Sequence, residues 1–317
     1  MPDRALDERL DQAIDAMLAG AGLEPDPELD SLMAVARALR EMPARDFQSR
    51  LKTQLQRRAS MTQTTTQPIR EGFRTVTPYI AVPEGAKLIE LLKATFGAEE
   101  LYRSPSPAGF HAEIRIGDSI VMIGSGESLR GHERIGAFHV YVPDCDAAYQ
   151  RAMGAGATSL GEPADQPYGE RSGFVKDFAG NHWYIATRFR DTVVPEGLGT
   201  VLPFLLPNNA RALIDFLKQA FGAEEMGVHE ESGRVMHAAV RIGDAVLEMG
   251  EPHEPQSLPG RFFLYVEDCD AWYRRAVAAG ATSFEEPADQ PYGHRTAVVL
   301  DPSGNQWVPA SLLKSAT

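Results

Sequence analysis

The segment Ala164-Asp-Gln-Pro-Tyr-Gly-Glu-Arg171 is followed, after a short gap, by Asp177-Phe-Ala-Gly-Asn-His-Trp183. Both segments occur a second time, as Ala288-Asp-Gln-Pro-Tyr-Gly-His-Arg295 and Asp301-Pro-Ser-Gly-Asn-Gln-Trp307. Equivalent residues in the two copies lie 124 positions apart, as Tyr168 and Tyr292 illustrate. A repeat of this length corresponds to a small domain. A duplication therefore organises most of the chain.

The duplication extends upstream through three further pairs of matching segments. They are Phe96-Gly-Ala-Glu-Glu100 with Phe221-Gly-Ala-Glu-Glu225, Arg115-Ile-Gly-Asp118 with Arg241-Ile-Gly-Asp244, and Asp144-Cys-Asp-Ala147 with Asp268-Cys-Asp-Ala271. These matches predict one domain at residues 74–190 and a second at 198–313. Residues 1–60 carry apolar residues at spacings of three and four, which predicts a separate helical domain. Residues 61–73 have almost no apolar pattern, which predicts a linker.

Each copy alternates strand and helix patterns in the same order. In the first copy, the predicted elements are a strand Val76–Val82, a helix Gly85–Phe96, and strands Glu99–Arg103, Phe110–Ile116 and Ser119–Ile123. The order then recurs as a strand Ala137–Val142, a helix from its cap Asp144 to Met153, and strands near Thr158–Leu160, Ser172–Asp177 and His182–Thr187. The chain thus contains four predicted βαβββ modules and belongs to the α+β class.

Composition narrows the functions that the protein can have. The net charge is −13 and the isoelectric point is about 5.1, which argues against nucleic-acid binding and favours neutral or cationic ligands. We find no apolar run of about 18 residues and no apolar signal segment at the start, so we expect no membrane association. Only two cysteines are present, at equivalent repeat positions. This usage fits a cytoplasmic protein.

The quoted segments together resemble the vicinal oxygen chelate superfamily, which includes glyoxalase I, bleomycin-resistance proteins and extradiol dioxygenases. Within the superfamily, the residues of these motifs resemble the PhnB-like branch. The resemblance covers both repeats and not residues 1–72. It implies that two modules form one curved mixed sheet around a cleft, and that two such units pair. We expect the two modules of each repeat to share a sheet. We also expect the tandem copies to form the pair within one chain, which allows a monomer.

The resemblance also implies where a metal would bind, because metal enzymes of the family use one ligand from the first and one from the last strand of each module. Those positions fall on Thr77, Met122, Ala137, Tyr184, Leu202, Glu248, Arg261 and Val308. Only Glu248 is a plausible ligand, and a shift of one or two positions adds His139 or His182. No set of three ligands results, so we expect no metal and no cofactor. His139 and Glu248 are the candidates if a divalent metal is bound.

Several other residues are candidates for ligand binding, each with a structural alternative. Arg171 and Arg295 either pair with nearby aspartates (Asp165 or Asp177, Asp289 or Asp301) or hold an anionic group at the edge of a cleft. His237 and its equivalent His111 are either buried structural residues or ligand contacts. The aromatic candidates are either core residues or walls that stack on a planar ligand; they are Tyr168, Trp183, Tyr292 and Trp307.

The two copies differ in charge near these arginines. Glu170 precedes Arg171 and is expected to neutralise it, whereas His294 precedes Arg295. The second copy also contains Glu248 and Arg261, so we expect its cleft to be the more polar one. An anionic ligand group is therefore expected near Arg295 and not near Arg171.

These observations favour a small-molecule binding protein of the glyoxalase/bleomycin-resistance type. We expect it to sequester or sense a ligand in one or both clefts without a metal. One alternative is a metal-dependent lyase, isomerase or dioxygenase of the same superfamily. Another is a regulatory or interaction protein that uses the helices in residues 1–60. The sequence does not identify the ligand.

Overall fold

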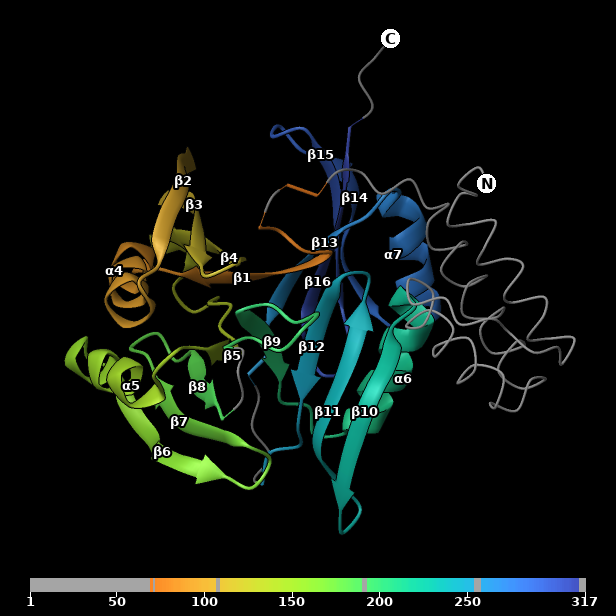
Figure 1. Ribbon diagram of the computed structural model, residues 1–317. Helices are drawn as coiled ribbons and strands as arrows, with labels where there is room; N and C mark the ends of the chain where they lie inside the picture. The colour runs from red at the N-terminus through yellow and green to blue at the C-terminus, as the bar shows by residue number, and fades with distance from the viewer. Residues whose placement is uncertain (1–68, 71, 107–108, 190–192, 254–257, 314–317) are drawn as a thin grey trace, which may run out of the picture. The chain divides into compact units, whose positions relative to one another are not determined.

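The four predicted βαβββ modules all form, as Figure 1 shows. The computed structural model describes residues 69–313 apart from 71, 107–108, 190–192 and 254–257. These residues belong to one compact unit, Thr66–Thr317. The predicted helical domain at residues 1–60 and most of the predicted linker lie outside the described residues. Within the part of the chain that the structure describes, no helix is both long enough and apolar enough to span a membrane.

The elements follow the predicted order, and several strands, such as β2 and β6, are longer than the apolar pattern alone indicates. The first module contains β1 (Val76–Val82), α4 (Gly85–Phe96), β2 (Glu99–Ser106), β3 (Gly109–Ile116) and β4 (Ser119–Gly126), and a short 3-10 helix (Glu127–Leu129) follows it. The second contains β5 (Ala137–Tyr141), α5 (Cys145–Gly154), β6 (Thr158–Gln166), β7 (Glu170–Lys176) and β8 (His182–Arg188). The third contains β9 (Val201–Leu205), α6 (Ala210–Phe221), β10 (Glu224–Glu231), β11 (Arg234–Ile242) and β12 (Ala245–Met249). The fourth contains β13 (Arg261–Tyr265), α7 (Cys269–Ala278), β14 (Thr282–Asp289), β15 (His294–Leu300) and β16 (Gln306–Leu312).

The helices begin and end where the sequence predicts, because local chemistry fixes their termini. The Asp144 carboxylate caps α5 by accepting a hydrogen bond from the backbone N–H of Ala147 at 2.9 Å. Asp268 caps α7 in the same way. Gly97 ends α4 and Gly222 ends α6, both with a left-handed backbone (φ 67° and 68°) that favours glycine.

The strands form two eight-stranded sheets, each built from one module of each repeat. Sheet I has the strand order β14-β15-β16-β13-β1-β4-β3-β2, and sheet II has the order β10-β11-β12-β9-β5-β8-β7-β6. The α+β fold class and the tandem arrangement of four βαβββ modules are therefore confirmed. The expectation that the two modules of one repeat share a sheet is wrong. The first module shares sheet I with the fourth, and the second shares sheet II with the third. Antiparallel pairs join the repeats at Val76↔Leu264 and at His139↔Leu202.

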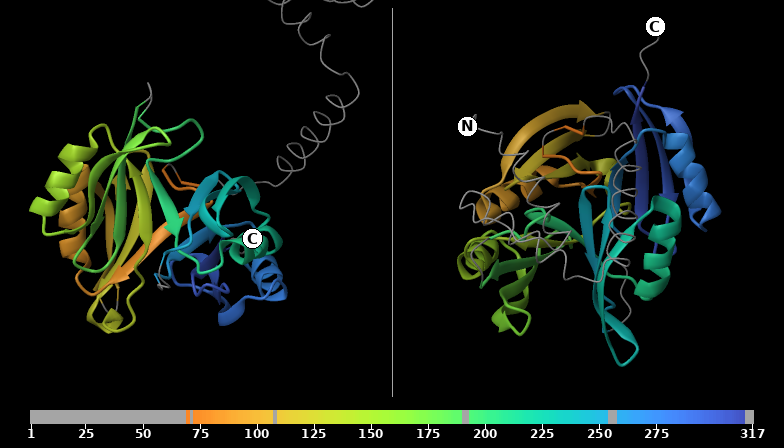
Figure 2. Two further views of the ribbon diagram at one scale, coloured as in Figure 1. Left: turned by 90° about the horizontal axis from the view of Figure 1, so that it is seen from below. Right: turned by 45° about the vertical axis from the view of Figure 1, so that its right-hand side comes forward.

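The hydrophobic cores follow the repeats, whereas the sheets cross between them. One core gathers residues of the first and second modules, among them Leu92, Ile123 and Trp183. The other core gathers residues of the third and fourth modules, such as Leu217 and Trp307. Accordingly, α4 lies beside α5 and α6 lies beside α7 in the views of Figures 1 and 2. We call the face of each sheet turned away from these helices its helix-free face.

The repeated Ile-Gly-Asp turns join the first module to the third. Asp244 accepts hydrogen bonds from the backbone N–H and the hydroxyl of Thr75, both at 2.7 Å. Asp118 accepts one from the backbone N–H of Thr200 at 2.7 Å. A Cβ atom on Gly243 would lie 2.3 Å from the hydroxyl oxygen of Thr75, so this position also needs glycine for close approach. These turns, which the sequence shows only as matching segments of the two copies, are thus contacts between the repeats.

We expect Gly243→Ala to destabilise the protein more than Gly222→Ala. Both glycines lie in the third module with φ near 60–68°, but Gly222 has open space around its would-be Cβ. A left-handed alanine costs about 1–3 kcal/mol by itself. The added clash with Thr75 should raise the loss at Gly243 by at least about 1 kcal/mol. Urea midpoints of the two variants measure the difference, and equal midpoints would show that the turn does not hold the repeats together.

Candidate functional site

A row of charged side chains crosses the helix-free face of sheet II. It consists of Glu170 on β7, His139 on β5, Glu248 on β12 and His237 on β11. Strand alternation explains why His139 and Glu248 point this way. Phe138 and Val140 belong to one core, so His139 between them faces the opposite side, and the same holds for Glu248 between Leu247 and Met249. We call these four residues the acidic row.

The acidic row is continuous and its centre is buried. The His139 Nδ1 atom lies 2.7 Å from a carboxylate oxygen of Glu248, and its Nε2 atom lies 3.7 Å from a carboxylate oxygen of Glu170. The His237 Nε2 atom lies 3.7 Å from the other oxygen of Glu248. Exposure of the side chains is 13% for His139 and 7% for Glu248, but 50% for His237. His237 therefore marks the solvent-exposed end of the row.

The charges in the row determine its protonation. Burial alone would raise the pKa of Glu248, but the charge and hydrogen bond of His139, with a contribution from His237, outweigh it and hold the pKa at about 2. Burial alone would lower the pKa of His139, but the charge and hydrogen bond of Glu248, with the charge of Glu170, raise it. At weakly acidic pH, Glu248 is thus a carboxylate and His139 an imidazolium. The side chain of Glu170 lies on the other side of His139.

Aromatic side chains surround the row. The Tyr141 hydroxyl donates a hydrogen bond of 3.3 Å to Glu170, and its ring lies 4.5 Å from the His139 ring. Tyr184 and Phe204 lie against each other with ring centroids 4.8 Å apart, on the strands that flank β5. Charged groups among aromatic side chains are typical of sites that hold small organic molecules.

The residues present do not fit a metal ion. A metal needs several donors that converge on one point. His139 instead uses opposite ring nitrogens for the two carboxylates, so Glu170 and Glu248 lie on different sides of the imidazole. Across the described residues, no group of three His, Cys, Asp or Glu side chains is arranged to hold a metal. His182, the other candidate from the sequence, makes none of the contacts of the acidic row; burial, followed by Lys176, lowers its pKa.

Sheet I lacks the acidic row at the equivalent positions. The repeat alignment places Phe263 at the position of His139, Met122 at that of Glu248 and His294 at that of Glu170. Glu248 and Arg261 are expected from the sequence to share one cleft, but Glu248 lies in sheet II and Arg261 in sheet I. The two therefore do not make one polar site.

Arg171 and Arg295 lie on the other side of their strands, against the helices. Arg171 bonds to Asp146 on α5 at 2.5 and 2.9 Å and to Asp165 at 2.8 Å. Arg295 makes the same contacts with Asp270 on α7 and with Asp289. This geometry matches the structural interpretation of these arginines. It gives no reason for an anion to bind at Arg295 and not at Arg171.

Glu170 does not neutralise Arg171, contrary to the expectation from sequence. Successive side chains of a strand point to opposite faces, so Glu170 reaches His139 while Arg171 reaches the helix. The sequence shows that Glu170 and His294 differ between the copies, but the neighbour that this difference affects is His139 and not Arg171. Tyr141 is not among the candidates that the sequence indicates.

The tryptophan and tyrosine candidates fall into two classes. Trp183 and Trp307 are core residues, 1% and 0% exposed, and their indole N–H groups donate to the buried carboxylates of Asp177 and Asp301. Tyr168 and Tyr292 lie in turns with more than half of their surface exposed. Of the four, Tyr168 lies close enough to the acidic row to interact with it: burial, and then the charges of Glu170 and Glu248, raise the pKa of its hydroxyl.

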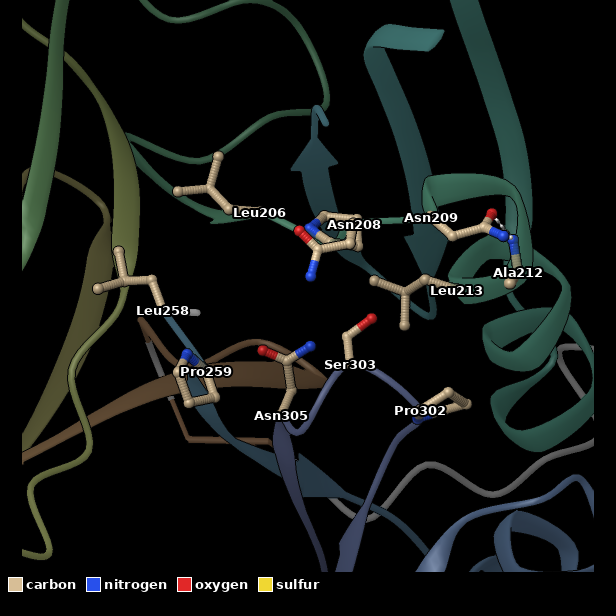
Figure 3. Close-up of a pocket in the computed structure, with 11 residues that line it drawn as sticks. Leu206, Asn208, Asn209, Ala212, Leu213, Leu258, Pro259, Pro302, Ser303 and Asn305 are labelled. Carbon is tan, nitrogen blue, oxygen red and sulfur yellow. Dashed lines mark hydrogen bonds between the residues drawn. The ribbon is translucent and has the colours of Figure 1, made fainter. Parts of the chain in front are cut away.

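A cavity of about 200 Å³ lies elsewhere in the second repeat, between the segment before α6, the segment before β13 and the turn before β16 (Figure 3). In Figure 3 Asn208 and Ser303 point toward its centre. The side-chain oxygen of Asn209 instead accepts a hydrogen bond of 3.0 Å from the backbone N–H of Ala212 and so caps α6. In the first repeat, Lys87 lies 4.0 Å over the ring of Phe178 at the equivalent place. Ala212 and Pro302 replace these two residues in the second repeat, so the cavity results from smaller side chains.

The acidic row makes stability depend on pH in a defined direction. Because the pKa of His139 is raised in the folded protein, His139 contributes fully to the free energy of unfolding below its pKa in the unfolded chain, about 6.5. This contribution is lost as pH rises through its pKa in the folded protein. The lowered pKa of Glu248 means that its contribution is complete above about 4.5 and is lost as pH falls toward about 2. The pair therefore stabilises the protein most between about pH 4.5 and 6.5.

We expect the difference in melting temperature between wild type and a His139→Gln/Glu248→Gln double variant to change with pH accordingly. Wild type should gain most, relative to the variant, at pH 5–6 and lose that advantage as pH rises through the raised pKa of His139. Thermal unfolding across pH 4–9 measures it. A difference that does not vary with pH would contradict the assigned charges.

Comparison with known proteins agrees with this architecture. The family model of the glyoxalase/bleomycin resistance protein/dioxygenase superfamily matches residues 73–185 and 198–308. An uncharacterized protein of Mycobacterium tuberculosis is 34% identical over 133 residues, which are 38% of this chain and 78% of that protein. A Mycobacterium bovis protein with the provisional name glyoxylase CFP32 is 27% identical over 173 residues, 52% of this chain and 65% of that protein. The crystal structure of glyoxalase I from Zea mays superposes with a TM-score of 0.59 at 16% identity, covering 76% of this chain and 92% of that one. Because the family model matches both repeats, the chain belongs to the glyoxalase/bleomycin resistance protein/dioxygenase superfamily.

Proposed function

We propose that the protein binds a small molecule on the helix-free face of sheet II, at the acidic row and without a metal. The observation that carries the proposal is the buried Glu170–His139–Glu248 arrangement, in which two carboxylates flank one imidazole among aromatic rings. Its donors do not converge on one point, so they favour organic hydrogen-bonding groups over a metal ion. Sequestration or sensing of such a molecule is the function that this arrangement supports best.

The charge of the row indicates the class of ligand. In the buried part of the row, Glu170 and Glu248 face one imidazolium, so these three residues keep a net negative charge even when His139 is protonated. A cationic group, or one rich in hydrogen-bond donors, would be favoured beside Glu170 and Glu248. Tyr184 and Phe204 offer ring faces to an attached planar group. We therefore propose a planar cation as the ligand class. Assignment to the PhnB-like branch stays a prediction from sequence.

A second candidate function is a proton-transfer enzyme, such as an isomerase or lyase. The observation that favours it is that both nitrogens of His139 face carboxylates, an arrangement that can hold and move a proton. Catalysis would require His139 itself, whereas binding requires mainly the carboxylates. The metal-dependent version of this function and a role for residues 1–60 in regulation remain alternatives without support from the described residues.

We expect benzamidine, a planar cation, to bind wild type and to bind Glu248→Gln at least about tenfold more weakly. The reason is that a charged hydrogen bond contributes about 1.5–3 kcal/mol. Ligand-observed NMR titration measures both affinities. Glu113→Gln is a matched control, because Glu113 is also buried beside a histidine but lies in sheet I. It should leave benzamidine binding unchanged.

The metal-independent part of the proposal has its own test. Purified protein should contain less than one equivalent of transition metal, and a chelator should leave both its melting temperature and benzamidine affinity unchanged. A stoichiometric metal whose loss follows Glu248→Gln would contradict the proposal and support the metal-dependent enzyme. Equal benzamidine affinity in wild type and Glu248→Gln would show that the acidic row is not the binding site.

A further inference from the structure

Arg261 is a largely buried cation without a carboxylate partner. It lies at the start of β13 on the helix-free face of sheet I, because the next residue, Phe262, belongs to the core. One guanidinium nitrogen donates to the side-chain oxygen of Gln306 at 3.1 Å, and the buried Nε atom has no hydrogen-bond partner. Among the described residues, no Asp or Glu lies within ion-pair distance of Arg261.

Such a group is unfavourable in the protein alone. Burial lowers the pKa of Arg261, because its charge loses water and the charge of Glu285, which lies beyond ion-pair distance, offsets only part of that loss. Buried polar atoms normally have partners, and one that lacks a partner needs an explanation. A bound anion would supply both the missing charge and the missing acceptor.

The surroundings of Arg261 are aromatic and flat. The guanidinium lies 5.3 Å from the centre of the Tyr79 ring. Tyr79 in turn stacks with Phe263 at 5.5 Å and 28° and with His111 at 5.8 Å and 20°. These three near-parallel rings, on β13, β1 and β3, form an aromatic platform beside Arg261 against which a ring of a ligand can pack.

The one buried carboxylate on this platform is already neutralised. Glu113 forms two hydrogen bonds with Arg70 at 2.8 and 2.5 Å, and the pKa of Glu113 falls to about 2 because these bonds and His111 outweigh its burial. Arg70 therefore neutralises the charge of Glu113, so Glu113 is not a counter-ion for Arg261.

Comparison of the two repeats separates this site from the acidic row. Arg261 replaces Ala137, while Phe263 and Met122 replace His139 and Glu248. Sheet I has thus lost the anionic groups of sheet II and gained a cation at a neighbouring position. We propose that the helix-free face of sheet I is a second binding site, which takes a planar aromatic carboxylate with its carboxylate on Arg261 and its ring on the Tyr79 platform.

Benzoate is the probe for this site. Wild type should bind it, and Arg261→Met should bind it at least about tenfold more weakly, because the variant keeps the side-chain length but removes all five donors. Arg261→Lys keeps the charge without the planar fork and should bind at an intermediate level. Cyclohexanecarboxylate has the same charge without a flat ring and should bind more weakly than benzoate.

Melting temperatures distinguish a role of Arg261 in ligand binding from a role in stabilising the fold. Since methionine removes a buried unpaired charge, the melting temperature of Arg261→Met without ligand should equal or exceed that of wild type. Added benzoate should raise the melting temperature of wild type and not that of Arg261→Met. Glu248→Gln should leave benzoate affinity unchanged, so this test stands independently of the site in sheet II.

Three outcomes would overturn the proposal. One is equal benzoate affinity in wild type and Arg261→Met. Another is a large drop in melting temperature of ligand-free Arg261→Met, which would assign Arg261 to the fold. The third is binding of inorganic phosphate to wild type with an affinity equal to or above that of benzoate, which would mean that the ring platform does not take part.

Discussion

The antiparallel pairing of the first strands of modules from different repeats is the constraint on which the rest of the structure depends. Through β1–β13 and β5–β9, each sheet combines one module from each repeat. The two cores, in contrast, each consist of residues of one repeat, apart from Val76 in one and Val201 in the other. Separating the repeats would therefore break both sheets, while separating the modules of one repeat would open a core. Cohesion of the described unit thus does not depend on a single interface between repeats.

The duplication lets the molecule act as its own comparison. Features that both copies keep with the same contacts belong to the scaffold: the aspartates that bind the tryptophan indoles, the paired arginine forks and the Ile-Gly-Asp turns. Charged residues that differ between the copies lie on the helix-free faces in two places, as Glu248 against Met122 and Ala137 against Arg261 show. Repetition in a single sequence therefore indicates structure, and departures from it indicate where ligands are to be sought.

The sequence predicts the modules well because their signals are local. Apolar alternation, the Asp144 cap and Gly97 determine where elements begin and end. It does not predict which modules share a sheet, because both pairings satisfy the same alternation and the choice depends on contacts between distant segments. The site is affected in the same way. His139 and Glu248 appear separately as candidates, but they lie 109 positions apart in different repeats, and only the crossing of sheet II brings them to 2.7 Å.

Joining the repeats in one chain also explains how the two faces can have opposite charge. In a symmetric homodimer of one repeat, both sheets would contain the same residues, so a substitution on one face would appear on the other. In this chain, sheet I contains residues of the first and fourth modules and sheet II those of the second and third, so each face can change alone. Glu248 faces His139 in one sheet, while Met122 and Phe263 leave the other without a buried anion beside Arg261. The covalent link between the repeats removes the requirement for identical sites while keeping the paired-sheet architecture that forms them.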